Sequence, residues 1–245
     1  MKNNNVSNYE DAMQYINEQE ATDISYVKVG NGNKKLIVSF ASIAHLGFER
    51  KSSLMKWKFV EGYNFDVLYL RDQNKHWYLS ELTGIGKQFD HTKRFFSTLF
   101  RKYQQVLCTG ASMGGYASIL YGSLLNVEKV VASRPPTDLQ YIYDKLSQLE
   151  LGAGFRNKLR HVMLANPGLW KKYKELTGII NDNVLYDVFY LGDDGYKKKN
   201  PNNPREIIVH GDYHRHAIVK HPAVHDESGK CGPGHKILDW IKGTT

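Results

Sequence analysis

The amino-acid sequence predicts an α/β fold, in which a mostly parallel central sheet is flanked by helices and carries a helical cap-like insertion. Short apolar runs rich in β-branched residues alternate with amphipathic stretches between residues 24 and 133. A Gly-x-Ser-x-Gly turn at residues 110–114 joins one of these runs to a helix-like stretch. The chain has 245 residues, of which 41% are hydrophobic, enough for one sizeable core. We therefore expect a single domain over residues 1–245, with residues 137–181 as the insertion.

Patterns along the first part of the chain predict the elements that lead to the Gly-x-Ser-x-Gly turn. An amphipathic pattern predicts a short helix over 9–20, and apolar runs predict strands over 24–29, 35–40 and 66–70. Phe and Leu at helical spacing predict a second helix over 88–103. The Gly-Asn-Gly-Asn sequence at 30–33 predicts a hairpin between the first two strands.

The second part of the chain continues the alternation and then departs from it. The expected elements are a strand over 105–109, a helix over 116–125, a strand over 127–133, helices without a strand over 137–181, and a strand over 183–191. The last strand is expected over 216–220, because a strand at 206–210 would leave too little chain for a parallel crossover. A terminal helix is expected over 236–241.

The Gly-x-Ser-x-Gly turn places a serine where a nucleophile is expected. A serine at a sharp strand-to-helix turn is strained, and its neighbours Gly110 and Gly114 are small because backbone segments crowd there. The turn projects the Ser112 hydroxyl above the sheet edge. The N–H of Met113 lies near the positive end of the helix dipole and is expected to help hold an oxyanion.

A serine nucleophile needs a histidine base within hydrogen-bonding reach. His235 is the first candidate, because the sequence Cys231-Gly-Pro-Gly precedes it and predicts a flexible loop just before the terminal helix. Such a loop lets the imidazole fold back over Ser112. His225 and His221 lie nearer the expected last strand and are the alternatives.

The base needs a carboxylate to orient it, expected after the preceding strand in the chain order Ser, acid, His. Asp193 and Asp194 lie side by side after a strand-ending glycine, and the spacing favours Asp194. Asp212 is the alternative acid if residues 207–210 form a strand.

The second oxyanion donor is expected in the loop after an early strand, where Ala41 or Ser42 supplies an N–H. The loop over 71–78 leaves another strand at the same edge, so its polar and aromatic side chains are expected to line the substrate site or to pack. The histidines between 210 and 225 lack a zinc pattern such as His-Glu-x-x-His, so we expect no metal site.

Composition limits the compartment and the partners. The formal net charge of +8 favours anionic partners, but no nucleic-acid-binding module is visible. Cys108 and Cys231 are the only cysteines, and Cys108 is expected as a small buried residue of a central strand. No apolar stretch is long enough to span a membrane and no signal peptide is visible, so we expect a soluble cytoplasmic protein.

Taken together, these features resemble the α/β-hydrolase superfamily. Gly110-Ala-Ser112-Met-Gly114 is similar to its nucleophile elbow, Gly192-Asp-Asp194 to its acid turn and Gly234-His235 to its histidine loop. The resemblance runs from about Tyr26 to Ile241, and it implies acyl-enzyme chemistry at Ser112 with no obligatory cofactor. The early loop reads Phe-Ala-Ser where many esterases have His-Gly.

Within the superfamily, the chain also looks like compact bacterial enzymes of surface-polysaccharide or accessory-secretion loci. Some of these are O-acetyltransferases that move acetyl from acetyl-CoA to a capsular sugar. We expect an esterase acting on a small-molecule or glycan ester, with an acetyltransferase as the alternative. A non-catalytic subunit with the same scaffold is the third hypothesis.

Overall fold

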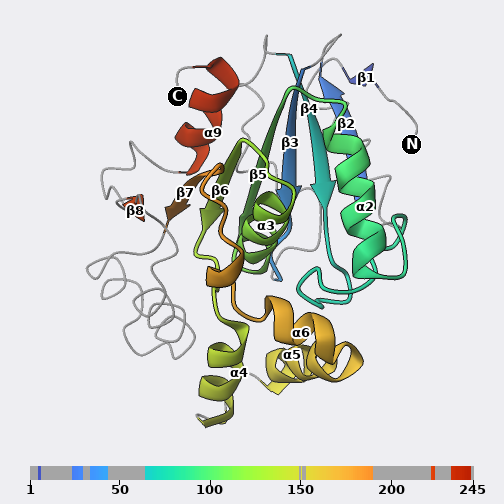
Figure 1. Ribbon diagram of the computed structural model, residues 1–245, viewed down its shortest axis with the longest axis vertical. Helices are drawn as coiled ribbons and strands as arrows, with labels where there is room; N and C mark the ends of the chain where they lie inside the picture. The colour runs from blue at the N-terminus through green and yellow to red at the C-terminus, as the bar shows by residue number, and fades with distance from the viewer. Residues whose placement is uncertain are drawn as a thin grey trace.

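The computed structural model describes residues 5–6, 24–29, 34–43, 64–148, 150, 153–189, 222–223 and 233–243. Its strands form one eight-stranded sheet in the order β1-β2-β4-β3-β5-β6-β7-β8 (Figure 1). The strands are β1 (Asn5–Val6), β2 (Ile24–Val29), β3 (Lys35–Phe40), β4 (Phe65–Leu70), β5 (Gln105–Ala111), β6 (Lys129–Ser133), β7 (Leu185–Phe189) and β8 (Pro222–Ala223). The predicted α/β class with a mostly parallel sheet is therefore confirmed.

Five neighbouring strands, β4, β3, β5, β6 and β7, run parallel to one another. Strands of a parallel sheet that is covered on both faces are apolar on both sides. β3 and β4 have this character: Leu36, Ile37 and Val38 of β3 are fully buried, and so is almost all of β4. The continuous apolar runs of the sequence thus correspond to central strands.

The predicted hairpin between the first two strands is wrong. β2 pairs antiparallel with β4, and β3 pairs in parallel with β4 and β5, so β4 lies between β2 and β3. A turn signal acts over a few residues, whereas strand order depends on how the buried backbone N–H and C=O groups of the whole sheet find hydrogen-bond partners. β3 pairs with β4 and β5 on its two edges, so the turn sequence at 30–33 does not decide its pairing.

Helices cover the sheet on the side that faces the viewer in Figure 1, where α2 (Phe89–Phe100) and α3 (Met113–Leu124) lie. α3 contacts β3, β5 and β6 and is buried from Met113 through Ser123. A helix that is apolar all round belongs in a protein interior. α2 instead shows one apolar stripe, with Phe89, Phe96 and Phe100 buried.

The helical segment expected over 137–181 contains α4 (Leu139–Gln148), α5 (Ala153–Ala165), α6 (Pro167–Tyr173) and the short 3₁₀ helix η3 (Thr177–Ile179). These helices lie beyond the carboxyl ends of the parallel strands (Figure 1). In the part of the chain that the structure describes, no helix has the length and apolar character to cross a membrane.

The end of the chain departs from one expectation. The terminal helix, α9 (Pro233–Lys242), begins at Pro233, so His235 lies in its first turn and not in a flexible loop. Proline fits the first turn of a helix, because its φ is already helical and no N–H is lost there. The described strand β8 (Pro222–Ala223) follows the expected strand over 216–220. Residues 9–20, 206–210 and 216–220 are outside the described residues.

Aromatic side chains join β3, α2, α3 and the loop after β4 into one core. The Phe40 ring lies 5.3 Å from that of Tyr78 and 5.8 Å from that of Tyr121, and Phe96 lies 4.9 Å from Tyr121. Edge-to-face and stacked aromatic pairs of this kind contribute about 0.5–1.5 kcal/mol beyond their buried area. Cys108 is fully buried in β5, as predicted, and burial raises the pKa of its thiol.

Replacing Phe96 tests this core. Phe96 is fully buried against Phe40, Phe100 and Tyr121. Phe96→Ala is expected to lower the free energy of unfolding by about 3–5 kcal/mol, because the lost contacts leave a cavity. Its neighbour Phe95 is only half-buried, so Phe95→Ala is the matched control and is expected to cost clearly less. Urea unfolding measures both variants, and equal losses would contradict the described core.

Candidate active site

Ser112 lies at the turn between β5 and α3 in a strained backbone conformation. Its φ is 53° and its ψ is −121°, in a region that residues with a side chain rarely adopt. Such a conformation costs about 1–3 kcal/mol and persists only where the surroundings enforce it. The Ser112 N–H donates to the carbonyl of Ser133 at 2.9 Å, and its carbonyl accepts from the N–H of Tyr116 at 3.0 Å. Its half-buried hydroxyl does not cap α3, which leaves it available for chemistry.

Three glycines around Ser112 are explained by close packing. A Cβ on Gly110 would lie 2.3 Å from the carbonyl oxygen of Gly114, and one on Gly114 would lie 2.1 Å from the carbonyl oxygen of Phe40. A Cβ on Gly115 would lie 3.0 Å from Cβ of Pro135. The crowding that the sequence predicts at the two flanking glycines is therefore present, and it extends to the third.

The expected oxyanion donors lie beside this turn. Met113 is the first residue of α3, where the N–H has no acceptor within the helix. Of the two candidates after β3, the N–H of Ala41 already donates to the carbonyl of Leu70 at 2.8 Å. The N–H of Ser42 is the candidate that remains. The Ser42 hydroxyl is buried and has no hydrogen-bond partner among the described residues.

The carboxyl ends of four strands form one row. Ala111 of β5 pairs with Ser133 of β6, Ser133 with Phe189 of β7, and Phe189 with Ala223 of β8. Ser112 directly follows the first of these residues. Segments that leave neighbouring parallel strands at one edge meet there, which is the usual place for an active site in such sheets.

The acid candidates and one histidine candidate follow this row in the sequence. Asp193 and Asp194 come soon after Phe189, and His225 comes two residues after Ala223. All three lie outside the described residues, as do Asp212 and His221. Their side-chain positions therefore remain predictions.

His235 is described, and its helix runs away from the edge that carries Ser112. The carbonyls of Trp240 and Ile241, at the end of α9, accept hydrogen bonds from Nζ of Lys35 at 2.7 and 3.0 Å. Lys35 begins β3, at the opposite end of the sheet. His235 lies about 9 Å along the helix from that end, at 1.5 Å per residue.

Ser112 is much farther from the same end. Lys35 pairs with Gln105, and the rise from Gln105 to Ser112 is about 23 Å at 3.3 Å per residue. The His235 side chain is exposed. By these rises, α9 places His235 nearer the amino end of the sheet, whereas Ser112 lies at the carboxyl edge.

The loop over 71–88 packs against both α3, beside the sheet, and the helical segment over 137–181. Trp77 and Tyr78 are fully buried, so they pack in the core and do not line an open site. The Trp77 ring meets Tyr116 of α3 edge-on at 5.7 Å and Phe155 of α5 at 5.4 Å. Of the two roles expected for this loop, packing is therefore the one that its aromatic residues take.

A pair of histidines forms a second contact between this loop and α5. His76 stacks on His161, with ring centroids 4.5 Å apart, and its Nδ1 lies 3.0 Å from the hydroxyl of Ser80. Burial, followed by the nearby His161 and Lys158, lowers the pKa of His76 to about 4. His76 is thus neutral at pH 7 and packs as an uncharged ring.

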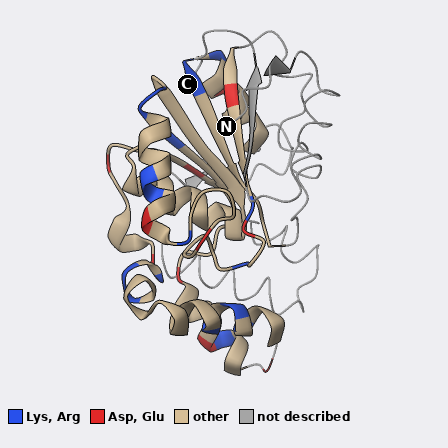
Figure 2. Ribbon diagram, turned by 90° about the vertical axis from the view of Figure 1, so that its right-hand side faces the viewer, with Lys and Arg blue, Asp and Glu red and all other residues tan. Residues whose placement is uncertain are grey.

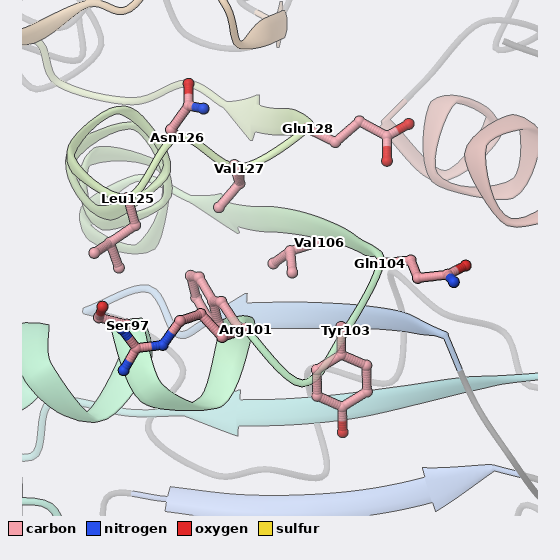
Figure 3. Close-up of a pocket in the computed structure, with 10 residues that line it drawn as sticks. Ser97, Arg101, Tyr103, Gln104, Val106, Leu125, Asn126, Val127 and Glu128 are labelled. Carbon is pink, nitrogen blue, oxygen red and sulfur yellow. The ribbon is translucent and has the colours of Figure 1, made fainter.

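A pocket of about 250 Å³ lies at the other end of the sheet (Figure 3). Its lining comes from the ends of α2 and α3 and from the residues that begin β5 and precede β6, including Arg101, Val106 and Glu128. This position is opposite the Ser112 turn. Among the described residues, no group of three or more His, Cys, Asp or Glu side chains is arranged to hold a metal ion. The histidine-rich stretch over 210–225 is outside them.

Comparison with known proteins supports the fold. No family model and no curated protein matches the sequence. Among solved structures, MPT51 of Mycobacterium tuberculosis is similar with a TM-score of 0.50 and 12% identity, over 90% of this chain and 91% of that chain. The capsule O-acetyltransferase of Neisseria meningitidis serogroup A has a TM-score of 0.48 and 14% identity, over 90% and 91% of the two chains.

A chain of a glycosylation-associated protein complex from Streptococcus agalactiae has a TM-score of 0.48 and 18% identity, over 70% of this chain. The match spans only 35% of that longer chain. Likeness at these identities concerns the fold alone. The protein has an α/β-hydrolase-like fold, as the sequence resemblance implied.

Gly114 provides a direct test of the crowded turn. Gly114→Ala is expected to displace the end of β3 or the start of α3, because its Cβ would overlap the Phe40 carbonyl oxygen. We expect a loss of at least about 2 kcal/mol in the free energy of unfolding, in the range of overpacked sites. Gly154→Ala is the matched control, since nothing lies within 4 Å of its added Cβ. Equal stability of the two variants would refute the described approach.

Proposed function

We propose that the protein is a serine-dependent acyl hydrolase of the esterase type, which works through an acyl-enzyme on Ser112. The observation that supports this most is the backbone of Ser112, with φ of 53° at a strand-to-helix turn packed between glycines. Strain of this size at an ordinary turn brings no benefit, whereas a nucleophile elbow needs it to present the hydroxyl.

In the proposed reaction, a histidine takes the proton of the Ser112 hydroxyl as Oγ attacks the ester carbonyl carbon. The resulting oxyanion accepts hydrogen bonds from the N–H groups of Met113 and Ser42. The histidine then protonates the leaving alcohol as the ester C–O bond breaks. Water, deprotonated by the same histidine, attacks the acyl-enzyme, and the histidine returns that proton to Oγ of Ser112 as the acyl C–O bond breaks and the carboxylic acid leaves, so no cofactor is required.

Strand register favours His225 as this base over His235, the first choice from the sequence. His225 follows the row of strand ends on which Ser112 lies, whereas α9 carries His235 toward the opposite end of the sheet. Asp194 remains the proposed orienting acid, with Asp193 beside it and Asp212 as the alternative.

Charge near the carboxyl edge favours an ester that carries a negative group, such as an acidic glycan. α5 and α6 contain Arg156, Lys158, Arg160, Lys171 and Lys172, and neither helix contains an acidic residue (Figure 2). Cationic residues that gather near a site raise the local concentration of an anionic substrate.

Transfer of the acyl group to a sugar hydroxyl would use the same acyl-enzyme, with acetyl-CoA as the donor. The acceptor decides between esterase and O-acetyltransferase. Incubation with acetyl-CoA, with and without an acidic glycan, separates them. Acetyl on the glycan would replace the esterase proposal by the transferase, and release of acetate without transfer would support the esterase.

Ser112→Ala tests the nucleophile. The variant is expected to lose covalent labelling by a fluorophosphonate and all turnover of p-nitrophenyl esters, because it lacks the attacking oxygen. Ser118→Ala is a matched control, since the Ser118 hydroxyl is buried in the next turn of α3 and donates to the carbonyl of Gly115. Labelling of Ser112→Ala at the wild-type rate would refute the proposal. A folded wild-type protein that is not labelled would favour a non-catalytic subunit.

Separate replacement of two histidines tests the base. His225→Gln is expected to lower kcat by at least about 10³-fold, as loss of a general base does in serine enzymes, while His235→Gln changes it by less than about threefold. Ester hydrolysis near pH 8 measures both. The reverse order of losses would restore His235 as the base, and small losses in both would place the base elsewhere.

A further inference from the structure

The two peptide units on either side of Ala41 are each held by a hydrogen bond. In the first, the N–H of Ala41 donates to the carbonyl of Leu70 at 2.8 Å. In the second, the carbonyl of Ala41 accepts from the hydroxyl of Tyr78 at 3.1 Å, and this hydroxyl shares its proton with the carbonyl of Leu70, also at 3.1 Å. The exit of β3 is thus tied to the end of β4 by one buried phenol.

The carbonyl of Ala41 and the N–H of Ser42 belong to one planar trans peptide, in which the two groups point in opposite directions. A bond that holds the Ala41 oxygen toward Tyr78 therefore directs the Ser42 N–H away from Tyr78. Rotation of this peptide would redirect the N–H, and it would also leave the buried Ala41 oxygen without its partner. An unpaired buried carbonyl costs about 1–3 kcal/mol, so Tyr78 opposes the rotation.

Tyr78 is itself held by an unusually complete set of contacts. Its N–H donates to Oδ2 of Asp72 at 2.9 Å, its carbonyl accepts from the hydroxyl of Tyr121 at 2.8 Å, and its ring meets Phe40 edge-on. Its φ is 59°, a strained value for a residue with a side chain. The Tyr78 side chain is fully buried, so a role at the protein surface does not explain these contacts.

The fixed peptide lies next to the nucleophile turn. A Cβ on Gly114 would approach the carbonyl carbon of Ala41 to 2.9 Å, so the exit of β3 touches the first turn of α3. Met113, the other expected donor, precedes Gly114 in that turn. The two N–H groups proposed for the oxyanion therefore belong to backbone segments in direct contact.

We propose that Tyr78 is a positioning residue for the oxyanion hole: by holding the Ala41 carbonyl, it aims the Ser42 N–H at the oxyanion. This inference rests on the proposed esterase function. Tyr78 does not touch the substrate and acts through the Ala41–Ser42 peptide. Its effect is thus confined to the transition state, in which negative charge develops on the carbonyl oxygen of the substrate ester.

Tyr78→Phe tests the proposal, because it removes one hydroxyl and keeps the buried ring. We expect kcat for a p-nitrophenyl ester to fall about 10- to 100-fold, below the loss on deleting an oxyanion donor outright, with KM changed by less than about twofold. Affinity for an arylboronic acid, which forms a tetrahedral anion on the serine, is expected to fall in parallel with kcat/KM. A merely structural role would not produce this parallel loss.

Tyr103→Phe is the matched control. The Tyr103 hydroxyl donates to Oδ2 of Asp66 at 2.6 Å at the amino end of the sheet, far along the strands from Ser112. Removal of this hydroxyl is expected to affect stability without changing kcat. If both variants keep wild-type kcat, or lose it equally, Tyr78 is not a positioning residue. If the wild-type protein neither hydrolyses esters nor reacts with a fluorophosphonate, the proposed function fails first.

Tyr121→Phe keeps the proposal testable should Tyr78→Phe not fold. It leaves the Tyr78 hydroxyl in place and removes the bond that holds the Tyr78 carbonyl. We expect a smaller loss of kcat, about threefold to tenfold, again with an unchanged KM. An unchanged kcat in folded Tyr121→Phe would then overturn the proposal.

Discussion

The close approach of the exit of β3 to the first turn of α3 is the constraint on which the site depends. The carbonyl oxygen of Phe40 lies only 2.1 Å from where a Cβ of residue 114 would be, so the two backbones touch without a side chain between them. This contact fixes the turn at Ser112 and brings the Ala41–Ser42 peptide beside the N–H of Met113. The aromatic core around Phe40 stabilises the same contact from behind, because the Phe40 ring packs against α3 and the loop after β4.

Backbone strain is concentrated at the carboxyl edge of the sheet. Positive φ values occur at Lys75, Trp77 and Tyr78 after β4, at Ser112 after β5 and at Arg134 after β6. Each of these loops follows a buried parallel strand. The free energy of strand pairing offsets the cost of the strained backbone. A rigid sheet with strained exits is therefore suited to hold a hydroxyl and two N–H groups in place before the substrate arrives. Such preorganisation is how enzymes stabilise a developing oxyanion.

Sequence patterns predicted the local features well and the non-local ones poorly. The central strands and the nucleophile turn were predictable, because apolar runs and glycine spacing report on each segment's own surroundings. The predicted hairpin between β2 and β3 was wrong, since strand order depends on backbone hydrogen bonding across the whole sheet and not on the local turn. His235 was expected in a loop because Gly-Pro-Gly precedes it, but the same proline begins α9. The role of Tyr78 left no local signal, since its hydroxyl acts on a peptide 37 residues earlier in the chain.

Identification of the acylated residue tests whether the strained Ser112 is the nucleophile. The protein is mixed with p-nitrophenyl acetate, quenched in acid during turnover, digested and examined by peptide mass spectrometry. We expect an acetyl group on the Ser112 hydroxyl, formed at a rate no slower than turnover. Acetyl on another side chain that forms and decays at the rate of turnover, or rapid turnover without any acylated serine, would contradict it.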